Sequence, residues 1–201
     1  MTLPPRPALI LASGSPYRRE LLGRLRVPFD VDVPQVDETA AADEAPATTA
    51  LRLSVLKAET VAIRHPGAVV IGSDQVAECE GRPFGKPGSH EAAVVQLRTL
   101  RGKVVRFQSG LCVIGPHRGA TKIQSRVIAT TVHFRPVTDE QIERYLRLET
   151  PYDCAGSAKA EGLGITLLDR VESGDPTALI GLPLIALVSM LDAIDFPLLT
   201  A

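Results

Sequence analysis

The chain has 201 residues, of which 45% are hydrophobic, so it is long enough for one domain with a substantial core. Its formal net charge of -1 offers no overall basic field for nucleic acid, and any polyanion site has to be a local cluster of cations. Cys79, Cys112 and Cys154 form no C-x-x-C pair, as expected for free thiols in a reducing cytoplasm. No apolar stretch is long enough to span a bilayer, so we expect a cytoplasmic protein without membrane contact.

The N-terminal stretch 8–22 predicts a strand, a tight turn and a helix. Its opening apolar run is typical of a strand buried on both faces. Ser15 is a good N-cap, and Pro16 suits the first helical position. A strand that turns directly into a helix presents free backbone N–H groups beside Ser13 and Arg18. Such a corner suits a phosphate, although an ordinary turn with solvated arginines explains this stretch equally well.

The following segments predict a half-exposed strand over 29–34 and a helix over about 50–64, capped by Thr48 or Thr49. The expected buried stripe of this helix consists of Leu51, Val55, Ala58 and Ala62. Lys57 then lies away from the core. Glu38, in the acidic loop before the helix, has no distinctive pattern of its own.

The run Val69–Gln75 predicts a central strand, because it begins with β-branched residues. Asp74 stands at its polar carboxyl end. Ligands of open α/β sheets gather at such strand ends, so an acid placed there is a candidate functional group. Lys86 follows in a loop whose backbone is fixed by glycine and proline.

The rest of the chain alternates similarly. We expect a hairpin turn at 80–83, then a helix over 89–100 with Ala92, Val95 and Leu100 inward, and strands over 104–114 and 123–134. A capping box at 138–141 predicts a further helix, with Ile142, Tyr145 and Leu148 inward. A glycine-punctuated loop over 154–164, a short strand ending at Leu168 and a terminal helix after Leu184 complete the chain. These elements predict a single α/β domain over 1–201, with a mixed sheet that has a long antiparallel part and is flanked by helices.

The candidate groups suit hydrolysis of a polyphosphate. Carboxylates hold divalent ions that carry phosphate charge, while cations and backbone amides bind the remaining oxygens. The sequence contains no P-loop and no G-x-G-x-x-G, so it does not favour kinase-like or dinucleotide-binding functions.

An ordered series of motifs resembles the Maf family of nucleoside triphosphate pyrophosphatases. The motifs are L-I-L-A-S-G-S-P-Y-R-R-E-L-L, V-D-E, G-S-D-Q, G-K-P, S-G-L-C-V, C-A-G-S-A-K-A-E-G-L-G and D-P-T-A-L-I-G-L-P-L, which together cover nearly the whole chain. The resemblance implies an inosine triphosphatase-like α/β fold and hydrolysis of a nucleotide between its α- and β-phosphates. It also implies dependence on Mg²⁺ or Mn²⁺ and a homodimer.

The resemblance assigns a role to each matched position. Asp74 is the expected catalytic base and, with Glu38, a metal-site acid. The expected phosphate ligands are Ser13, Arg18, Lys57 and Lys86. We expect these cations to be exposed, so that their replacement leaves the melting temperature almost unchanged.

Three positions separate the branches of the family. Tyr17, Gln75 and Glu161 resemble the branch that acts on 7-methyl-GTP, whereas the dTTP/UTP branch usually has arginine, threonine and glutamine there. Ala158 replaces an aromatic residue often seen in the family. Methylation at N7 makes guanine a cation, which an aromatic face and a carboxylate favour. A 7-methyl-GTP pyrophosphatase that removes a modified nucleotide from the pool is therefore expected.

Two alternatives remain at this stage. The first is a pyrophosphatase for dTTP, UTP or another non-standard nucleotide. The second is a non-catalytic regulator of septum formation, the property from which the family took its name. A regulator would not require Asp74, Lys57 and Lys86 together, so their joint presence favours an enzyme.

Overall fold

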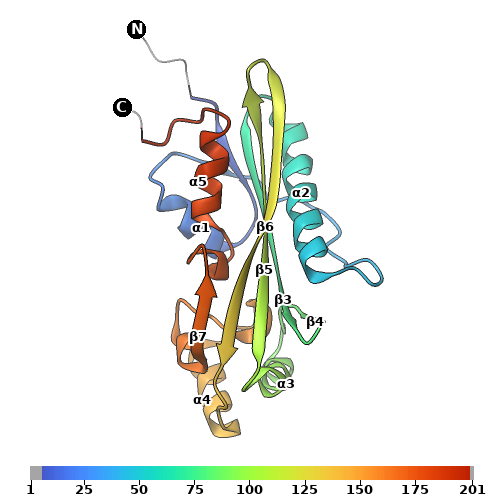
Figure 1. Ribbon diagram of the computed structural model, residues 1–201, viewed down its shortest axis with the longest axis vertical. Coiled ribbons are helices and arrows are strands. Elements are labelled where there is room, and N and C mark those ends of the chain that lie inside the picture. Colours follow the sequence, from blue (N-terminus) through green and yellow to red (C-terminus); the bar gives the residue numbers. More distant parts are fainter. Residues whose placement is uncertain (1–5, 200–201) are drawn as a thin grey trace.

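The computed structural model describes residues 6–199, which form an elongated molecule around one mixed sheet (Figure 1). Within these residues the sheet contains β1 (Leu9–Ala12), β2 (Asp30–Val31), β3 (Val69–Cys79), β4 (Arg82–Phe84), β5 (Val104–His117), β6 (Ala120–Phe134) and β7 (Leu168–Ser173). The α-helices are α1 (Pro16–Gly23), α2 (Pro46–Arg64), α3 (His90–Leu100), α4 (Asp139–Glu149) and α5 (Leu184–Asp192), and the short 3₁₀ helices are η1 (Ala155–Ser157), η2 (Leu163–Leu167) and η3 (Ala178–Ile180). No helix within 6–199 is both long and apolar enough to cross a membrane.

The sheet combines a short parallel part with a long antiparallel part. Its strand order is β2-β1-β3-β5-β6-β7, and β4 pairs with β3. β1 runs parallel to both β2 and β3, whereas all other pairs are antiparallel. β5 and β6 form one long hairpin, paired from Val104↔His133 to His117↔Ala120. The mixed sheet predicted from the sequence is thus confirmed.

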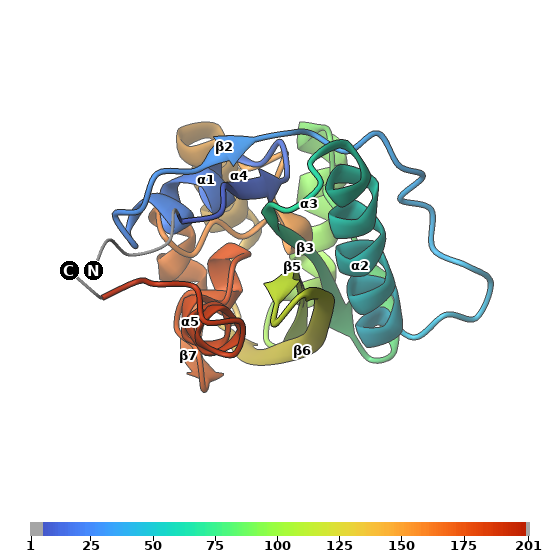
Figure 2. The same cartoon turned by 90° about the horizontal axis from the view of Figure 1, so that it is seen from above.

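Helices cover both faces of the sheet. α2 lies on one face, and α1 with α5 lies on the other (Figures 1 and 2). Side chains of β1 alternate between the two layers: Leu9 and Leu11 join the core beneath α1 and α5, while Ile10 and Ala12 join the core beneath α2. The prediction that this strand is buried on both faces is confirmed.

Local capping chemistry sets several helix starts where the sequence predicted them. The Ser15 hydroxyl accepts a hydrogen bond from the Arg18 amide at 3.4 Å, with Pro16 in the first helical position of α1. Ser89 caps α3, and Thr138 forms a complete capping box with Gln141 at the start of α4.

The prediction for α2 was wrong in its start and only partly right in its buried face. The helix begins at Pro46, after Ala45, which makes no side-chain cap. Its buried residues are Thr49, Ala50, Leu53, Ser54, Lys57, Ala58 and Val61. Ala58 is buried as expected, and Val55 and Ala62 pack partly buried against the same core. Lys57, however, was expected outside the core, yet it is only 4% exposed.

Two other inward faces and one strand also differ from expectation. In α3 the buried residues are Ala93, Val94, Leu97 and Leu100, so Val95 faces outward. In α4 the buried Leu146 takes the place expected of Leu148, which is exposed. The strand expected to end at Leu168 instead begins there, because the preceding residues form η2.

Candidate active site

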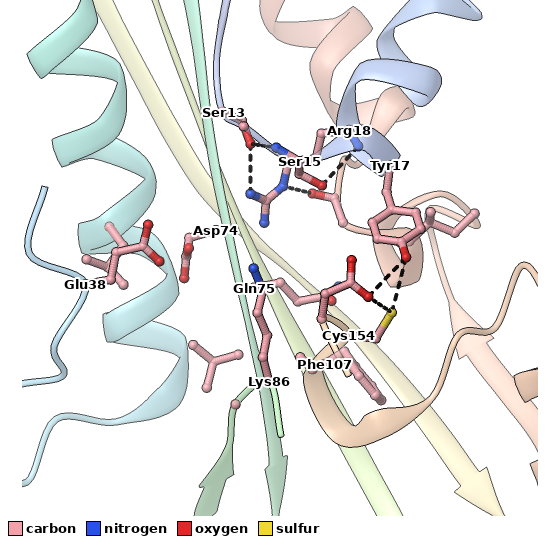
Figure 3. Close-up of a pocket in the computed structure, with 18 of the residues that line it drawn as sticks. Ser13, Ser15, Tyr17, Arg18, Glu38, Asp74, Gln75, Lys86, Phe107 and Cys154 are labelled. Carbon is pink, nitrogen blue, oxygen red and sulfur yellow. Dashed lines mark hydrogen bonds between the residues drawn. The ribbon is translucent and has the colours of Figure 1, made fainter. Parts of the chain in front are cut away.

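A cavity of about 690 Å³ opens beside β3, where the end of β1, the N-terminus of α1 and several loops meet (Figure 3). Its volume falls within the ~300–1,000 Å³ typical of small-molecule sites. All nine candidate residues from the sequence line it: Ser13, Tyr17, Arg18, Glu38, Lys57, Asp74, Gln75, Lys86 and Glu161. The fold therefore brings together residues that are up to about three-quarters of the chain apart.

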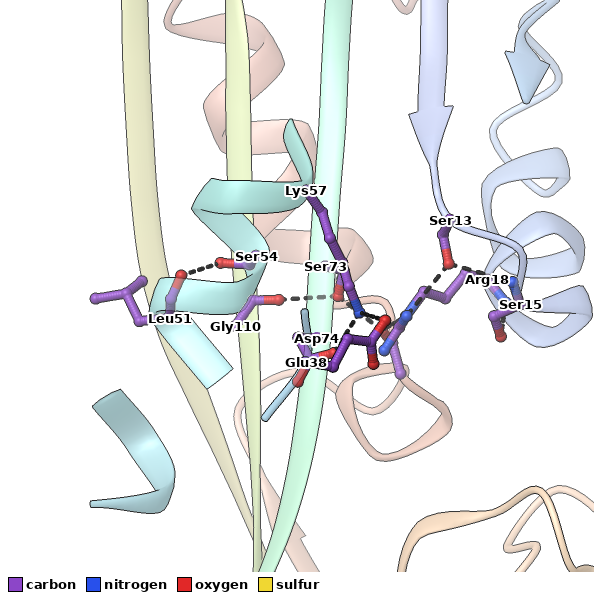
Figure 4. Close-up of polar contacts among 11 residues, drawn as sticks. Ser13, Ser15, Arg18, Glu38, Leu51, Ser54, Lys57, Ser73, Asp74 and Gly110 are labelled. Carbon is purple, nitrogen blue, oxygen red and sulfur yellow. Dashed lines mark hydrogen bonds and ion pairs between the residues drawn. The ribbon is translucent and has the colours of Figure 1, made fainter. Parts of the chain in front are cut away.

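A buried lysine joins two carboxylates at one end of the cavity. Lys57 Nζ lies 2.7 Å from Asp74 Oδ1 and 2.8 Å from Glu38 Oε1 (Figure 4). The side chains of Lys57 and Asp74 are 5% and 10% exposed, whereas that of Glu38 is 59% exposed. Within residues 6–199, Asp74 Oδ2 has no hydrogen-bond partner, so this oxygen is free to accept a proton or bind an ion.

Two glycines allow α2 to bring Lys57 next to Asp74. A Cβ atom at Gly72 would overlap the Ser54 carbonyl oxygen, and one at Gly110 would overlap the Ala50 carbonyl oxygen. Gly110 is the partner of Asp74 in the pairing of β3 with β5. The backbone of α2 therefore packs directly on the sheet, which places Lys57 over Asp74.

Arg18 lies beside this cluster and is held by uncharged groups. Its Nη1 donates to Ser13 Oγ at 3.2 Å, and its Nε donates to the Gly181 carbonyl at 2.9 Å. Burial lowers the pKa of Arg18, and the carboxylates of Asp74 and Glu38 oppose that shift. Because no carboxylate pairs directly with it in the described residues, the Arg18 charge remains available to an anion.

Polar side chains of the sheet fix η3 and the glycine that follows it. Gln75 Nε2 donates to Ser109 Oγ at 2.9 Å and to the Ala178 carbonyl at 2.9 Å. The Ser73 hydroxyl lies 2.9 Å from the same Gly181 carbonyl that binds Arg18. Ser109 and Gly181 were not among the candidate site residues, although the S-G-L-C-V and D-P-T-A-L-I-G-L-P-L motifs contain them.

The other end of the cavity contains Tyr17. Its hydroxyl donates to Asp153 Oδ1 at 3.3 Å, and Cys154 Sγ lies 3.7 Å from the same hydroxyl (Figure 3). Burial and the neighbouring Cys154 and Asp153 raise the pKa of Tyr17, which keeps the phenol protonated. Burial likewise raises the pKa of Cys154 to about 12, so its thiol is a poor nucleophile. Asp153 and Cys154 were not among the sequence candidates.

Glu161 shares this end of the cavity. Partial burial raises the pKa of Glu161, and nearby Lys159 opposes the shift. Lys159 Nζ lies 5.9 Å from the centre of the Tyr17 ring and forms an ion pair with Glu149 at 2.8 Å. The Lys159 charge is thus largely compensated by Glu149.

Lys86 reaches the cavity from the loop after β4. In the view of Figure 3 it lies between the Asp74 and Glu38 side and the Tyr17 and Cys154 side. The preceding Gly85 carbonyl accepts hydrogen bonds from Gln96 Nε2 at 3.0 Å and from the Gly156 amide at 3.3 Å. These bonds tie the Lys86 loop to the loop that carries Asp153.

The carboxylates present suit a hard divalent ion only in part. No group of three His, Cys, Asp or Glu side chains arranged as a metal site occurs within residues 6–199. Glu38 and Asp74 nevertheless meet at one ammonium, and Mg²⁺ is commonly bound by one or two carboxylates together with waters and substrate phosphates. The donor set therefore fits an ion that arrives with a phosphate ligand.

The fold and cavity define an α/β protein whose cleft separates a cationic, carboxylate-containing end from an aromatic end. The family model described as Maf-like protein matches residues 8–194. The chain belongs to the Maf family.

Similar proteins over nearly the full length carry one printed name, "7-methyl-GTP pyrophosphatase". The protein of Cupriavidus metallidurans is 59% identical over 192 residues, which are 96% of each chain. That of Cupriavidus pinatubonensis is 56% identical over all 201 residues, and that of Ralstonia nicotianae is 58% identical over 96% of this chain and 98% of its own.

Among solved structures, the Ham1 protein of Staphylococcus aureus superposes with a TM-score of 0.44 at 18% identity, covering 64% of this chain and 72% of its own.

Proposed function

We propose that this protein hydrolyses 7-methyl-GTP to 7-methyl-GMP and pyrophosphate, and thereby removes a modified nucleotide from the pool. The observation that carries the proposal is that one cavity has cationic side chains suited to a polyphosphate at one end and an aromatic ring with carboxylates at the other. The name shared by relatives that are 56–59% identical supports the same substrate.

The triphosphate would bind at the end formed by Arg18, Lys57 and Lys86. Arg18 already has two of its donors fixed by Ser13 and Gly181, so its remaining donors are preorganised for an oxyanion. The N-terminus of α1 lies at the same corner of the cavity and adds the positive end of its helix dipole. As charge develops on the phosphate oxygens, these groups stabilise it without having to reorganise.

Asp74 would act as the general base. A water beside Asp74 Oδ2 would lose its proton to that oxygen as the water oxygen attacks the α-phosphorus, while Lys57 holds Oδ1. The bond from the α-phosphorus to the bridging oxygen would break, and that oxygen would leave with pyrophosphate. Glu38 and Asp74 would hold a Mg²⁺ or Mn²⁺ ion, which when bound supplies positive charge to the phosphate oxygens and lowers the pKa of water. Arg18 and Lys86 would then bind the departing pyrophosphate.

The base would bind between Tyr17 and Glu161. N7-methylguanine is a cation, and a cation is attracted to the face of an aromatic ring and to a carboxylate. Glu161 would also accept from the guanine N1–H and exocyclic amine, and uracil and thymine lack that amine. Unmethylated guanine would lose only the attraction of the positive charge, whereas a pyrimidine base would lose that attraction and the contact of the exocyclic amine.

Product analysis tests the reaction type. We expect equal amounts of 7-methyl-GMP and pyrophosphate when the purified protein is incubated with 7-methyl-GTP and Mg²⁺ and the products are separated by anion exchange. Formation of 7-methyl-GDP and orthophosphate would place the cleavage at the β–γ bond and contradict the proposal. A homodimer and a cytoplasmic location, which the sequence predicts, stay predictions.

A further inference from the structure

The carboxylates that line the cavity fall into two sets. Glu38 and Asp74 contact Lys57, and Glu44 forms an ion pair with Arg52 at 2.7 Å. In contrast, neither carboxylate at the Tyr17 end, Asp153 or Glu161, has a basic group within 4.0 Å in the described part of the chain. Neither carboxylate at this end of the cavity therefore has a direct ion-pair partner.

Asp153 has a fixed relationship to the aromatic ring. Its Oδ1 accepts the hydrogen bond from the Tyr17 hydroxyl at 3.3 Å and lies 3.6 Å from Cys154 Sγ. The neighbouring backbone is held independently of this side chain, because the Gly88 amide donates to the Tyr152 carbonyl at 3.0 Å. A change of the Asp153 side chain should therefore leave the loop in place.

We propose that Asp153 is a specificity-determining residue, whose carboxylate provides a second negative charge for a cationic base stacked on Tyr17. The proposal rests on the proposed function and deepens it. An unpaired carboxylate in the cavity does not help to bind a triphosphate, because like charges repel. It does attract a base that carries a positive charge. Lys159, whose ammonium lies over the ring at 5.9 Å from its centre, is paired with Glu149 and forms no ion pair with Asp153.

Two substitutions separate the charge of Asp153 from its hydrogen bond. Asp153→Asn keeps the size and an acceptor oxygen for Tyr17 but removes the charge. Tyr17→Phe keeps the ring and the charge of Asp153 but removes the hydrogen bond. Asp169→Asn, on the exposed outer part of β7 and away from the cavity residues, is the matched control for loss of one carboxylate charge.

The readout is the ratio of kcat/KM for 7-methyl-GTP to kcat/KM for GTP. An unscreened pair of unit charges at about 4 Å in water gains ~1 kcal/mol, so we expect Asp153→Asn to lower the ratio roughly fivefold, mainly through 7-methyl-GTP. Tyr17→Phe and Asp169→Asn should each change it less than twofold. The ratio of the Kd values for 7-methyl-GMP and GMP, measured by calorimetry, should shift in parallel and does not depend on turnover.

Failure of this proposal is distinguishable from failure of the proposed function. If the unaltered protein prefers 7-methyl-GTP and Asp153→Asn keeps the same ratio, or loses activity equally on both substrates, the role of Asp153 in specificity is overturned while the function stands. If the unaltered protein does not prefer 7-methyl-GTP over GTP, the proposed function and this inference are overturned together.

Discussion

The ammonium of Lys57 lies 2.7 Å from Asp74 Oδ1 in a region where both side chains are almost fully buried. Lys57 approaches from α2 and Asp74 from β3, and the contact exists because Gly72 and Gly110 let the helix lie directly on the sheet. A charged pair that is removed from water is strongly coupled, so loss of either partner leaves the other uncompensated.

Asp74→Asn tests the role of this carboxylate in hydrolysis. The substitution keeps the size of the side chain but removes the charge that accepts a proton or binds an ion. We expect turnover to fall by at least ~10²-fold, the usual scale of a general base. The measurement is steady-state pyrophosphate release, with circular dichroism to confirm folding. Near-normal turnover by a folded Asp74→Asn protein would contradict the assignment.

Lys57→Met tests whether the lysine competes with a metal ion for Glu38 and Asp74. Without the ammonium, the two carboxylates lose their shared counter-charge, and we expect Mn²⁺ to bind more tightly in the absence of nucleotide. We also expect the variant to have a lower melting temperature than the unaltered protein. Mn²⁺ should raise the melting temperature of the variant more than that of the unaltered protein. Calorimetric titration with Mn²⁺ alone and thermal unfolding provide the two readouts.

Lys86→Met is the matched control, because Lys86 lines the same cavity but is exposed. It should weaken use of the nucleotide while leaving both the melting temperature and Mn²⁺ binding almost unchanged. Equal Mn²⁺ affinity in Lys57→Met and in the unaltered protein would show that the lysine does not compete with the ion.

The pH dependence of the preference for 7-methyl-GTP tests the role of the Glu161 carboxylate. Burial raises the pKa of Glu161, so on lowering the pH this residue is protonated earlier than an ordinary glutamate. Protonation removes the charge that attracts a cationic base, and the preference for 7-methyl-GTP over GTP should therefore fall as the solution becomes more acidic. In Glu161→Gln the preference should be low already and change less with pH. A preference that rises on acidification would contradict this role.

The combined change Tyr17→Arg, Gln75→Thr and Glu161→Gln tests substrate choice as a set. An arginine repels the cationic base, and removal of the carboxylate removes its counter-charge. We expect kcat/KM for 7-methyl-GTP to fall and that for UTP or dTTP to rise. Gln75 also anchors the η3 segment through Ala178, so a melting curve has to accompany the kinetics. If a folded variant kept the same ratio of kcat/KM for 7-methyl-GTP to kcat/KM for UTP or dTTP, these positions would not determine substrate specificity.

Local signals in the sequence indicated one part of the candidate site, and the family resemblance supplied the rest, including Glu38, Lys57 and Glu161. Ser13 lies in, and Tyr17 and Arg18 lie just after, a strand-to-helix turn that Ser15 and Pro16 specify. Asp74 follows a β-branched run. The buried position of Lys57 could not be predicted, because the pattern of apolar residues does not reveal that the backbone of α2 packs directly on glycines of the sheet. The contact between Tyr17 and Asp153 joins residues 136 positions apart, and no local pattern indicates it.

The catalytic efficiencies for 7-methyl-GTP, GTP, UTP and dTTP, compared by pyrophosphate release at one Mg²⁺ concentration, test the central claim most directly. Stacking on Tyr17 and the contact with Glu161 should each contribute roughly 1–2 kcal/mol, which together correspond to about 10²-fold. We therefore expect 7-methyl-GTP to be preferred by about that factor, with release by Asp74→Asn reduced at least ~10²-fold. Equal or higher efficiency with UTP or dTTP would contradict the assignment of the base site.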